Sequence, residues 1–336
     1  MSRPGSQPLR LGVVGTLVWD TIVRDDRPAA VVEEWGGIAY ALEALAAVLP
    51  EPWEIVPLIK VGRDLSERAL RFLRSLPRTQ VDAGVMVVPE PNNRVELRYD
   101  GPERRTERLR GGVPSWMWPE LAPRVRGCDA LYVNFISGFE MELDTARALR
   151  AGYPRPTYAD LHSLFLGIGA QGLRVPRELP LWHDWLRCFD AVQVNEDEFD
   201  LLGRAWGDPW GLAAASVGPE LKLITVTRGP RGAAYVAGPS LTDDPWRWPE
   251  SRHQLASPGT SRSAQVPLLG EPRRGDPTGC GDVWGATFFA RLLSGAGLEG
   301  AMADANGAAA RNVDYRGAAG LHRHLLGSIV PARTDR

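Results

Sequence analysis

The sequence has few cysteines, almost no excess charge of either sign and no long hydrophobic run. Each of these absences excludes a class of protein. Cys128, Cys188 and Cys280 are widely spaced and form no Cys-x-x-Cys pair, so we expect neither a disulfide framework nor a zinc site. The 39 Lys and Arg nearly balance the 41 Asp and Glu, which gives no general attraction to nucleic acid or anionic lipid. No segment reaches the roughly 18 apolar residues of a membrane span, and no signal peptide is apparent. We therefore expect a cytoplasmic protein whose partner is a small molecule, with no nucleic-acid or membrane partner.

Apolar runs alternate with helical patterns along most of the 336 residues. Runs typical of strands buried on both faces lie at 11–17, 130–136, 191–195 and 221–227, and patterns of helical period lie at 38–50, 65–76 and 141–151. Such an alternation is typical of βα units. It predicts a three-layer α/β/α fold around a mostly parallel central sheet.

Other stretches interrupt this alternation. Residues within about 21–37 and 85–109 alternate apolar and polar side chains around turn signals, which predicts a small β-sheet that projects as a lid. Residues 240–275 are rich in Pro, Ser and Arg and are predicted to form a surface excursion before the last strand. The organisation predicted is a single domain over 8–330, with flexible termini at 1–7 and 331–336.

The stretch "RRGDPTGCGDVWGATFFARLL", residues 273–293, places Gly279 and Gly281 on either side of Cys280, directly before an apolar helix. A glycine turn that leads into a helix exposes backbone N–H groups at the positive end of the helix dipole, which suits an anion such as phosphate. An ordinary tight turn, with Asp282 as a helix cap, would also explain the pattern. However, a carboxylate beside an anion site repels the anion. Its presence there is explained if Asp282 is a general base that deprotonates an attacking hydroxyl.

These residues resemble a known family. "DPTGCGD" is similar to the Asp-Thr-x-Gly-Ala-Gly-Asp signature of the ribokinase-like sugar kinases, the PfkB carbohydrate kinase family, and further motifs follow the family's order. They are "GTLVWDTIV", "EEWGGIAYALEAL", "KVGRD", "YADLHS", "VQVNEDEFDLL" and "TRGPRGA". The resemblance implies a ribokinase-like fold and ATP-dependent phosphorylation of a hydroxyl on a sugar, polyol or nucleoside.

The resemblance also implies roles for residues around the phosphates. Asp282 would be the catalytic base, and the backbone amides of Gly279, Cys280 and Gly281 would form the anion hole. Mg²⁺ would be held, through water, by Asn195 and Glu198. A monovalent cation such as K⁺ would lie at Asp276 and Thr278.

The same resemblance implies a separate set of binding residues for each of the two substrates. Asp20, Gly36 and Gly37 would bind the acceptor, and His162, which would otherwise be a structural residue, is a further candidate for a substrate contact. Arg94, in the predicted lid, would either reach the substrate or protect an exposed sheet edge. The nucleotide side would consist of Thr227, Gly229, Gly232 and Asn306.

The sequence departs from the family pattern mainly on the acceptor side. Ala41 stands where relatives carry an Asn that binds sugar hydroxyls, and His162 stands where an Asn is common. In the anion loop Pro277 replaces a Thr and Cys280 replaces an Ala, changes that leave the predicted base in place. The acceptor therefore stays open among a sugar, a polyol and a nucleoside.

Other interpretations remain at this point. A catalytically silent ligand-binding or nucleotide-binding sensor on the same fold is the main alternative, although retention of Asp282, Asn195 and Glu198 argues against it. A dehydrogenase is disfavoured because "LGVVGT" lacks the third glycine of a dinucleotide fingerprint. Trp19 and Trp35 would either stack on a substrate or pack the lid. The lid could also pair with its copy in a homodimer.

Overall fold

The computed structural model describes residues 7–24, 31–99, 105–204, 206–252 and 259–329. Its centre is an eight-stranded sheet with helices on both faces, as the sequence predicts. The strands, in spatial order, are β16 (Arg262–Val266), β15 (Ala233–Ala237), β14 (Leu223–Thr227), β13 (Ala191–Asn195), β10 (Thr157–Asp160), β9 (Ala130–Asn134), β1 (Arg10–Val14) and β4 (Glu54–Leu58). Six are parallel to one another, while β15 and β16 add antiparallel strands at one edge.

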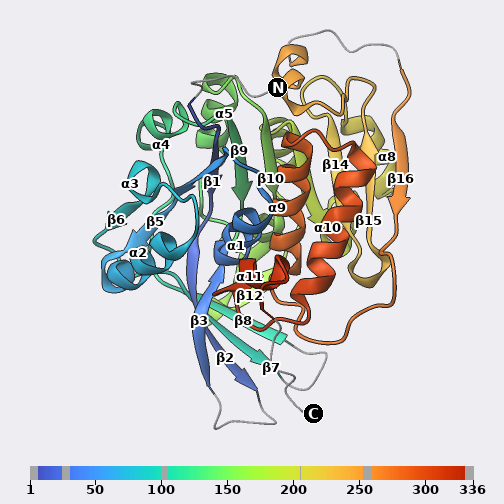
Figure 1. Ribbon diagram of the computed structural model, residues 1–336. Coiled ribbons are helices and arrows are strands. Elements are labelled where there is room, and N and C mark those ends of the chain that lie inside the picture. The colour runs from blue at the N-terminus through green and yellow to red at the C-terminus, as the bar shows by residue number, and fades with distance from the viewer. Residues whose placement is uncertain (1–6, 25–30, 100–104, 205, 253–258, 330–336) are drawn as a thin grey trace.

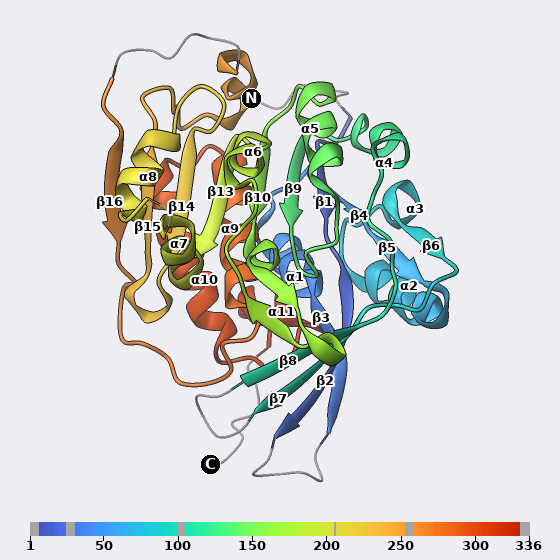
Figure 2. The ribbon, with the colours of Figure 1, turned by 180° about the vertical axis from the view of Figure 1, so that it is seen from behind.

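Two layers of helices bury the sheet. Figure 1 shows one face, covered by α1 (Ile38–Val48), α9 (Cys280–Leu293), α10 (Leu298–Asn312) and α11 (Leu321–Leu325). Figure 2 shows the other face, covered by α4 (Trp118–Val125), α5 (Leu143–Gly152), α6 (Trp182–Arg187), α7 (Glu196–Gly203) and α8 (Pro209–Ser216). Each layer has its own apolar core with the sheet. The continuous apolar runs of the central strands follow from this burial on both faces.

The projecting sheet is present, and its elements differ in their ends from those predicted. It consists of β3 (Val32–Gly37), β2 (Leu17–Arg24), β7 (Arg94–Tyr99) and β8 (Arg105–Arg110), in that order. The predicted strand at 11–17 is divided, because the chain turns at Gly15 and Thr16, where the Thr16 carbonyl accepts from the Ile38 amide. Residues 86–88, predicted within the lid, form β6 (Met86–Val88) and pair instead with β5 (Lys60–Gly62). The first part of the lid therefore begins earlier in the chain than predicted, at Leu17, and the second part begins later, at Arg94.

Two further groups of elements support the lid. Phe72 of α2 (Ser66–Ser75) packs against Trp35 of β3, α3 (Val81–Gly84) precedes β6, and beside β8 lies a hairpin of β11 (Leu166–Ile168) and β12 (Arg174–Pro176). Leu173, in the turn of this hairpin, forms a bridge with Arg108 of β8. One edge of the lid is therefore covered by the same chain.

The predicted surface excursion at 240–275 is wrong in part. Trp248 is 1% exposed and its Nε1 donates to the Thr242 carbonyl at 2.9 Å, while Trp246 stacks on Trp53. The stretch also contains the edge strand β16. Burial of two large indoles outweighs the Pro and Ser content that suggested a loop.

The described part of the chain contains no helix that is long and apolar enough to cross a membrane. The predicted flexible termini, 1–7 and 331–336, lie outside the described residues, apart from residue 7.

The register of the parallel strands brings polar residues into one row. Asn134 pairs with Asp160 across β9 and β10, and Asn195 pairs with Thr227 across β13 and β14. All four are the last residues of their strands. Since the carboxyl edge of an open parallel sheet is the usual place for a ligand, this row marks the edge on which to look for a site.

Candidate active site

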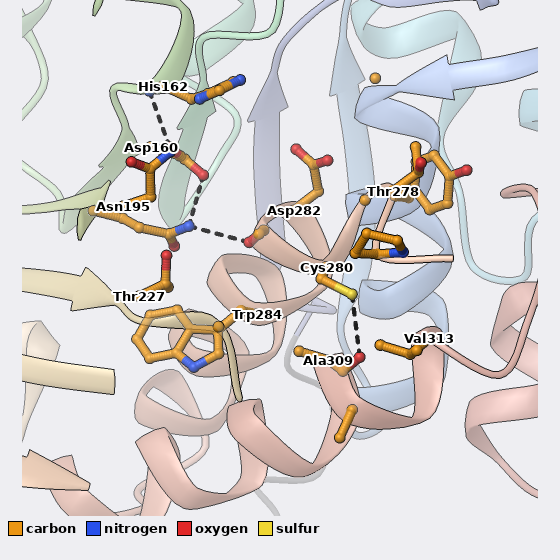
Figure 3. A pocket seen from close by; sticks show the side chains of 18 of the residues that line it. Asp160, His162, Asn195, Thr227, Thr278, Cys280, Asp282, Trp284, Ala309 and Val313 are labelled. Atoms are coloured by element: carbon orange, nitrogen blue, oxygen red, sulfur yellow. Dashed lines mark hydrogen bonds between the residues drawn. The ribbon is translucent and has the colours of Figure 1, made fainter. Parts of the chain in front are cut away.

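A cavity of about 900 Å³ lies at the carboxyl edge of the sheet. Its wall combines residues of the lid, the ends of β10, β13 and β14, the loop before α9, and α9 and α10. Figure 3 shows Asp160, Asn195, Thr227 and Asp282 around this space, with Trp284 and Ala309 farther along it. Segments far apart in the sequence thus meet in one pocket of a size that suits two small substrates.

The glycine loop is shaped by contact with α1. Gly279 has φ 76° and precedes the first residue of α9. A Cβ on Gly279 would lie 2.3 Å from the Tyr40 ring, so both the backbone conformation and the close approach require glycine. Gly279, Cys280 and Gly281 all line the cavity, and the positive end of the α9 dipole is directed there.

Cys280 contributes to this loop as a neutral thiol. Its amide donates to the Pro277 carbonyl at 3.1 Å, so the structure does not support the predicted contribution of this amide to the anion hole. Its Sγ donates to the Ala309 carbonyl at 3.4 Å, and burial raises the pKa of Cys280 to about 11. A thiolate nucleophile is therefore disfavoured.

The carboxylate of Asp282 is held by a residue that sequence reasoning missed. Asn134 Nδ2 donates to Asp282 Oδ1 at 2.7 Å, and Asn134 is fully buried at the end of β9. Gln193 reinforces the same corner, because its Nε2 donates to Asp160 Oδ2 at 2.7 Å and to the Gly281 carbonyl at 3.1 Å. A polar residue that ends a buried apolar strand was the available signal for Asn134.

Asn195 and Glu198 begin α7 as a reciprocal capping box. Asn195 Oδ1 accepts from the Glu198 amide at 3.0 Å, and Glu198 Oε2 accepts from the Asn195 amide at 2.8 Å. Both residues line the cavity. The motif therefore has a structural reason, capping of the helix, in addition to any binding role.

His162 lies against this pair. Its Nδ1 contacts Glu198 Oε1, its ring is 44% exposed, and it lines the cavity. Desolvation opposes protonation, but the carboxylates of Glu198 and Asp160 outweigh it and raise the pKa of His162. Burial and the charge of Glu198 raise the pKa of Asp160 to about 8. A carboxyl group that keeps its proton more readily than an ordinary Asp thus lies beside a histidine that is more readily protonated than an ordinary one.

On the lid side, Asp20, Gly36 and Gly37 lie together. Asp20 is 6% exposed and lines the cavity with Gly37. A Cβ on Gly36 would lie 1.7 Å from Asp20 Oδ2, so the carboxylate rests directly over the backbone of β3. The motif glycine thus makes room for the motif aspartate.

Arg94 lies elsewhere. Successive residues of a strand point to opposite faces, and Val95 and Leu97 line the cavity whereas Arg94 is not among the described residues that do. Its Nη1 forms an ion pair with Asp64 at 2.7 Å. The structure thus gives no support to a substrate contact by Arg94.

Trp19 and Trp35 lie edge to face at 4.9 Å, and Trp35 packs against Phe72 of α2. These contacts favour the interpretation that both indoles pack the lid.

The predicted nucleotide-side residues Thr227, Gly229, Gly232 and Asn306 also line the cavity. The side chain of Asn306 is bonded within the protein: Oδ1 accepts from Trp284 Nε1 at 2.8 Å, and Nδ2 donates to the Val266 carbonyl at 2.9 Å. Beside it, Leu268, Trp284, Ala309 and Val313 give this end of the cavity an apolar surface. A flat, largely apolar group fits such a surface.

Asp276 and Thr278 form one turn below the glycine loop. Asp276 Oδ1 accepts from the Thr278 amide at 3.0 Å and from its hydroxyl at 2.6 Å. Asn312, fully buried nearby, donates to the Thr278 carbonyl, and its own Oδ1 has no hydrogen-bond partner among the described residues. Within the described ranges, no cluster of three or more His, Cys, Asp or Glu is arranged as a direct metal site.

Comparison with known proteins agrees with this geometry. Residues 169–323 match the model of the pfkB family carbohydrate kinases. The ribokinase of Thermotoga maritima superposes with a TM-score of 0.69 at 16% identity, over 95% of this chain and 98% of that one. The chain has the ribokinase fold. The resemblance of this ribokinase-like protein to the PfkB carbohydrate kinases is thereby confirmed.

Further solved structures share the fold. Arabidopsis thaliana ribokinase, complexed with ribose and ATP, gives a TM-score of 0.67 at 17% identity, over 96% of this chain and 98% of that one. A nucleoside kinase of Burkholderia thailandensis, in complex with inosine, gives 0.62 at 15% identity, over 93% of each chain. A comparison with curated proteins gives no match.

Proposed function

We propose that this ribokinase-like protein transfers the γ-phosphoryl group of ATP to a hydroxyl group of a sugar, polyol or nucleoside. One observation carries the proposal: Asp282, Gly279 and Gly281 line the same cavity as Asp20 and the Asn195–Glu198 pair. A base, an anion site and two substrate sides are thus close together. This is the set of groups that phosphoryl transfer requires.

In the proposed reaction, the acceptor hydroxyl lies between Asp20 and Asp282. The Asp282 carboxylate takes the hydroxyl proton while the oxygen attacks the γ-phosphorus. A new O–P bond forms, the bond from phosphorus to the β,γ-bridging oxygen breaks, and ADP leaves. Backbone amides at the start of α9 stabilise the charge on the transferring group. Asn134 holds the base through its 2.7 Å hydrogen bond.

Asn195 and Glu198 would hold Mg²⁺, and the residues fit this ion through water better than by direct coordination. Burial, together with the charge of Glu198, raises the pKa of Asp160 to about 8, and a cation bound beside these residues would favour the ionised form of Asp160. When bound, Mg²⁺ supplies neutralisation of the donor phosphates and keeps much of its hydration shell. A K⁺ ion at Asp276 and Thr278 stays a prediction, as does a homodimer through the lid.

The lid supplies exclusion of water. Apolar residues of β2 and β7 face the cavity, so an acceptor bound beneath them would displace water from the reacting hydroxyl. Water would otherwise compete as the nucleophile and hydrolyse ATP. Relatives of the same fold bind ribose with ATP or bind inosine, which supports a sugar or nucleoside as the acceptor.

The proposal is tested by ADP release from ATP and Mg²⁺ in the presence of a panel of sugars, polyols and nucleosides. We expect acceptor-dependent ADP release by the wild type, strongly reduced in Asp282→Asn. ATP binding without turnover for any acceptor would contradict the proposal and favour a ligand-binding sensor.

A further inference from the structure

Tyr40 of α1 is a buried tyrosine whose hydroxyl has no hydrogen-bond partner among the described residues. The residue is only 3% exposed. The other tyrosines whose side chains the structure describes all have a hydroxyl that is hydrogen-bonded within the protein: Tyr132, Tyr153, Tyr158, Tyr235 and Tyr315. A buried tyrosine hydroxyl usually finds a partner. The partner of the Tyr40 hydroxyl is therefore water or a bound molecule.

The hydroxyl of Tyr40 is in contact with the open space of the cavity. Tyr40 lines the cavity, and it is the one residue of α1 among the described residues that do so. Its Oη is also absent from the fully buried, unpartnered polar atoms of the described residues. Since this oxygen has no protein partner there, it is not fully buried, and a molecule in the cavity can reach it.

The ring of Tyr40 has a structural reason that does not extend to the hydroxyl. A Cβ on Gly279 would lie 2.3 Å from the ring, so the ring packs directly on the glycine loop at the start of α9. Phenylalanine has the same ring and would pack there equally well. The presence of a hydroxyl at this position is therefore explained by a contact with something in the cavity.

The hydroxyl lies where the lid meets the glycine loop, and it carries its proton. Burial first, and then the charge of four nearby carboxylates, raise the pKa of Tyr40. The carboxylates are those of Glu34, Asp20, Asp276 and Asp282. The first two belong to lid strands and the others to the loop before α9 and to α9 itself. A protonated phenol at this meeting point can donate a hydrogen bond to a bound molecule.

Few hydroxyls in the wall of the cavity can donate to an acceptor molecule. Besides Tyr40, the described lining residues carry hydroxyls at Ser163, Thr227 and Thr278. Ser163 and Thr278 donate within the protein, at 2.5 Å and 2.6 Å. Thr227 belongs to the nucleotide side of the cavity. Among the described lining residues, Tyr40 is therefore the hydroxyl that remains for the acceptor side.

We propose that the Tyr40 hydroxyl binds the acceptor by donating a hydrogen bond to one of its non-reacting oxygens. The inference rests on the proposed function, because that function places the reacting hydroxyl of the acceptor between Asp20 and Asp282, beside Tyr40. The acceptor therefore carries a second oxygen near the hydroxyl that is phosphorylated. An alcohol without this oxygen would leave the phenol unpaired when the site is occupied, which disfavours its binding.

Tyr40→Phe removes the hydroxyl and keeps the ring on Gly279. The probes are ribose, fructose, myo-inositol and adenosine, and calorimetry with a non-hydrolysable ATP analogue and Mg²⁺ measures their binding without transfer. For the probe that the wild type binds most tightly, we expect Tyr40→Phe to weaken binding about fivefold to tenfold. Affinity for the ATP analogue should stay unchanged, which also shows that the variant is folded.

Tyr153→Phe is the matched control. Tyr153 is also 3% exposed, and its hydroxyl donates to the Cys128 carbonyl at 3.1 Å, away from the residues that line the cavity. This variant loses a buried hydroxyl of the same kind, and we expect it to bind the probe as the wild type does. An equal loss of probe affinity in both variants would overturn the inference.

Monodeoxy analogues of the bound probe identify the oxygen that Tyr40 contacts. Examples are 2-deoxyribose for ribose and 2′-deoxyadenosine for adenosine. We expect one analogue to bind the wild type about fivefold to tenfold more weakly than its parent, and Tyr40→Phe to bind the two with nearly equal affinity. Analogues that lose the same affinity in both proteins would overturn the inference.

ADP release from ATP separates this inference from the proposed function. Weaker probe binding by Tyr40→Phe, without ADP release by the wild type, would support the role of Tyr40 and contradict the kinase. ADP release with the same acceptor KM in the wild type and in Tyr40→Phe would support the kinase and overturn the inference. A lower kcat with unchanged acceptor binding would also overturn it, because the hydroxyl would then act on the transferring group. Binding of none of the four probes would overturn it as well.

Discussion

The two sides of the cavity differ in how they are built. The nucleotide side, from Asn195 to Asn306, lies within the region that matches the PfkB model, residues 169–323. The acceptor side, with Asp20, Gly36, Gly37 and His162, lies outside it. The first depends on backbone amides and glycines at a helix start, whereas the second depends on side chains of a lid sheet. Under the proposed function, the first set would perform the phosphoryl transfer and the second would select the acceptor.

The largest loss of activity is expected on removal of Asp282, the proposed base, on which both sides of the cavity depend. Asp282→Asn is expected to lower kcat by about 10²- to 10⁴-fold, because no carboxylate remains to take the proton of the attacking hydroxyl. ATP affinity, measured by calorimetry, should change little. Near-normal kcat would show that another group is the base.

A substitution confined to the acceptor side should affect use of the acceptor and leave ATP binding unchanged. Gly36→Ala places a Cβ where Asp20 Oδ2 lies, at 1.7 Å, so the carboxylate must move. We expect kcat/KM for the acceptor to fall by about 10- to 100-fold through overpacking, with ATP affinity retained. An equal loss of ATP affinity would mean that the two sides are not independent.

Asn134→Leu removes the hydrogen bond to Asp282 and keeps a buried side chain of similar size. The expected result is a decrease of kcat of about tenfold, since a bond to a charged group is lost, while KM for both substrates changes little. Steady-state kinetics separate the two parameters. An effect on KM alone would show that Asn134 does not position the base.

Glu198→Gln tests the cation site without loss of the helix cap. Gln also completes a capping box with Asn195, so thermal stability should be retained. The Mg²⁺ concentration for half-maximal activity should rise about fivefold to tenfold. Asp197→Asn, an exposed neighbour in the same turn, is the control, and an equal shift in this control would contradict a specific role for Glu198.

The smallest effect on catalysis is expected far from both sides. Asp190 is fully buried with Arg252, Arg150 and Lys222 at the opposite end of the sheet. Asp190→Asn should lower the free energy of unfolding by about 3–5 kcal/mol and leave kcat unchanged in the folded protein. Chemical denaturation measures the first quantity. A large loss of kcat would show that the cluster affects the site.

The same cluster gives a dependence of stability on pH. Burial would raise the pKa of Asp190, but its hydrogen bond and ion pairs, Arg252 first, hold it below its ordinary 3.8. Its contribution is therefore present above about pH 4 and is lost as the pH falls through the lower pKa of the folded state. Wild-type unfolding followed at decreasing pH should show this loss, and Asp190→Asn should show less of it.

The sequence predicted the layers of the fold because hydrophobic periodicity is a local signal. The family resemblance selected Thr227, Gly229, Gly232 and Asn306, and the structure brings these four residues to one cavity. The sequence did not predict Asn134 or Gln193 near Asp282, since these become neighbours only through the register of β9, β10 and β13. The prediction also displaced the lid strands, because β2 begins at Leu17 and not near 21, and β7 begins at Arg94 and not near 85. The face to which each lid residue points depends on these starting positions.

Phosphorus NMR of the protein with ATP, Mg²⁺ and a panel of alcohols tests the central claim most directly. The account predicts a new phosphomonoester signal that grows in equal amount with ADP, and that Asp282→Asn does not produce at a comparable rate. Bound ATP that stays intact with every alcohol, or that yields only inorganic phosphate, would contradict it.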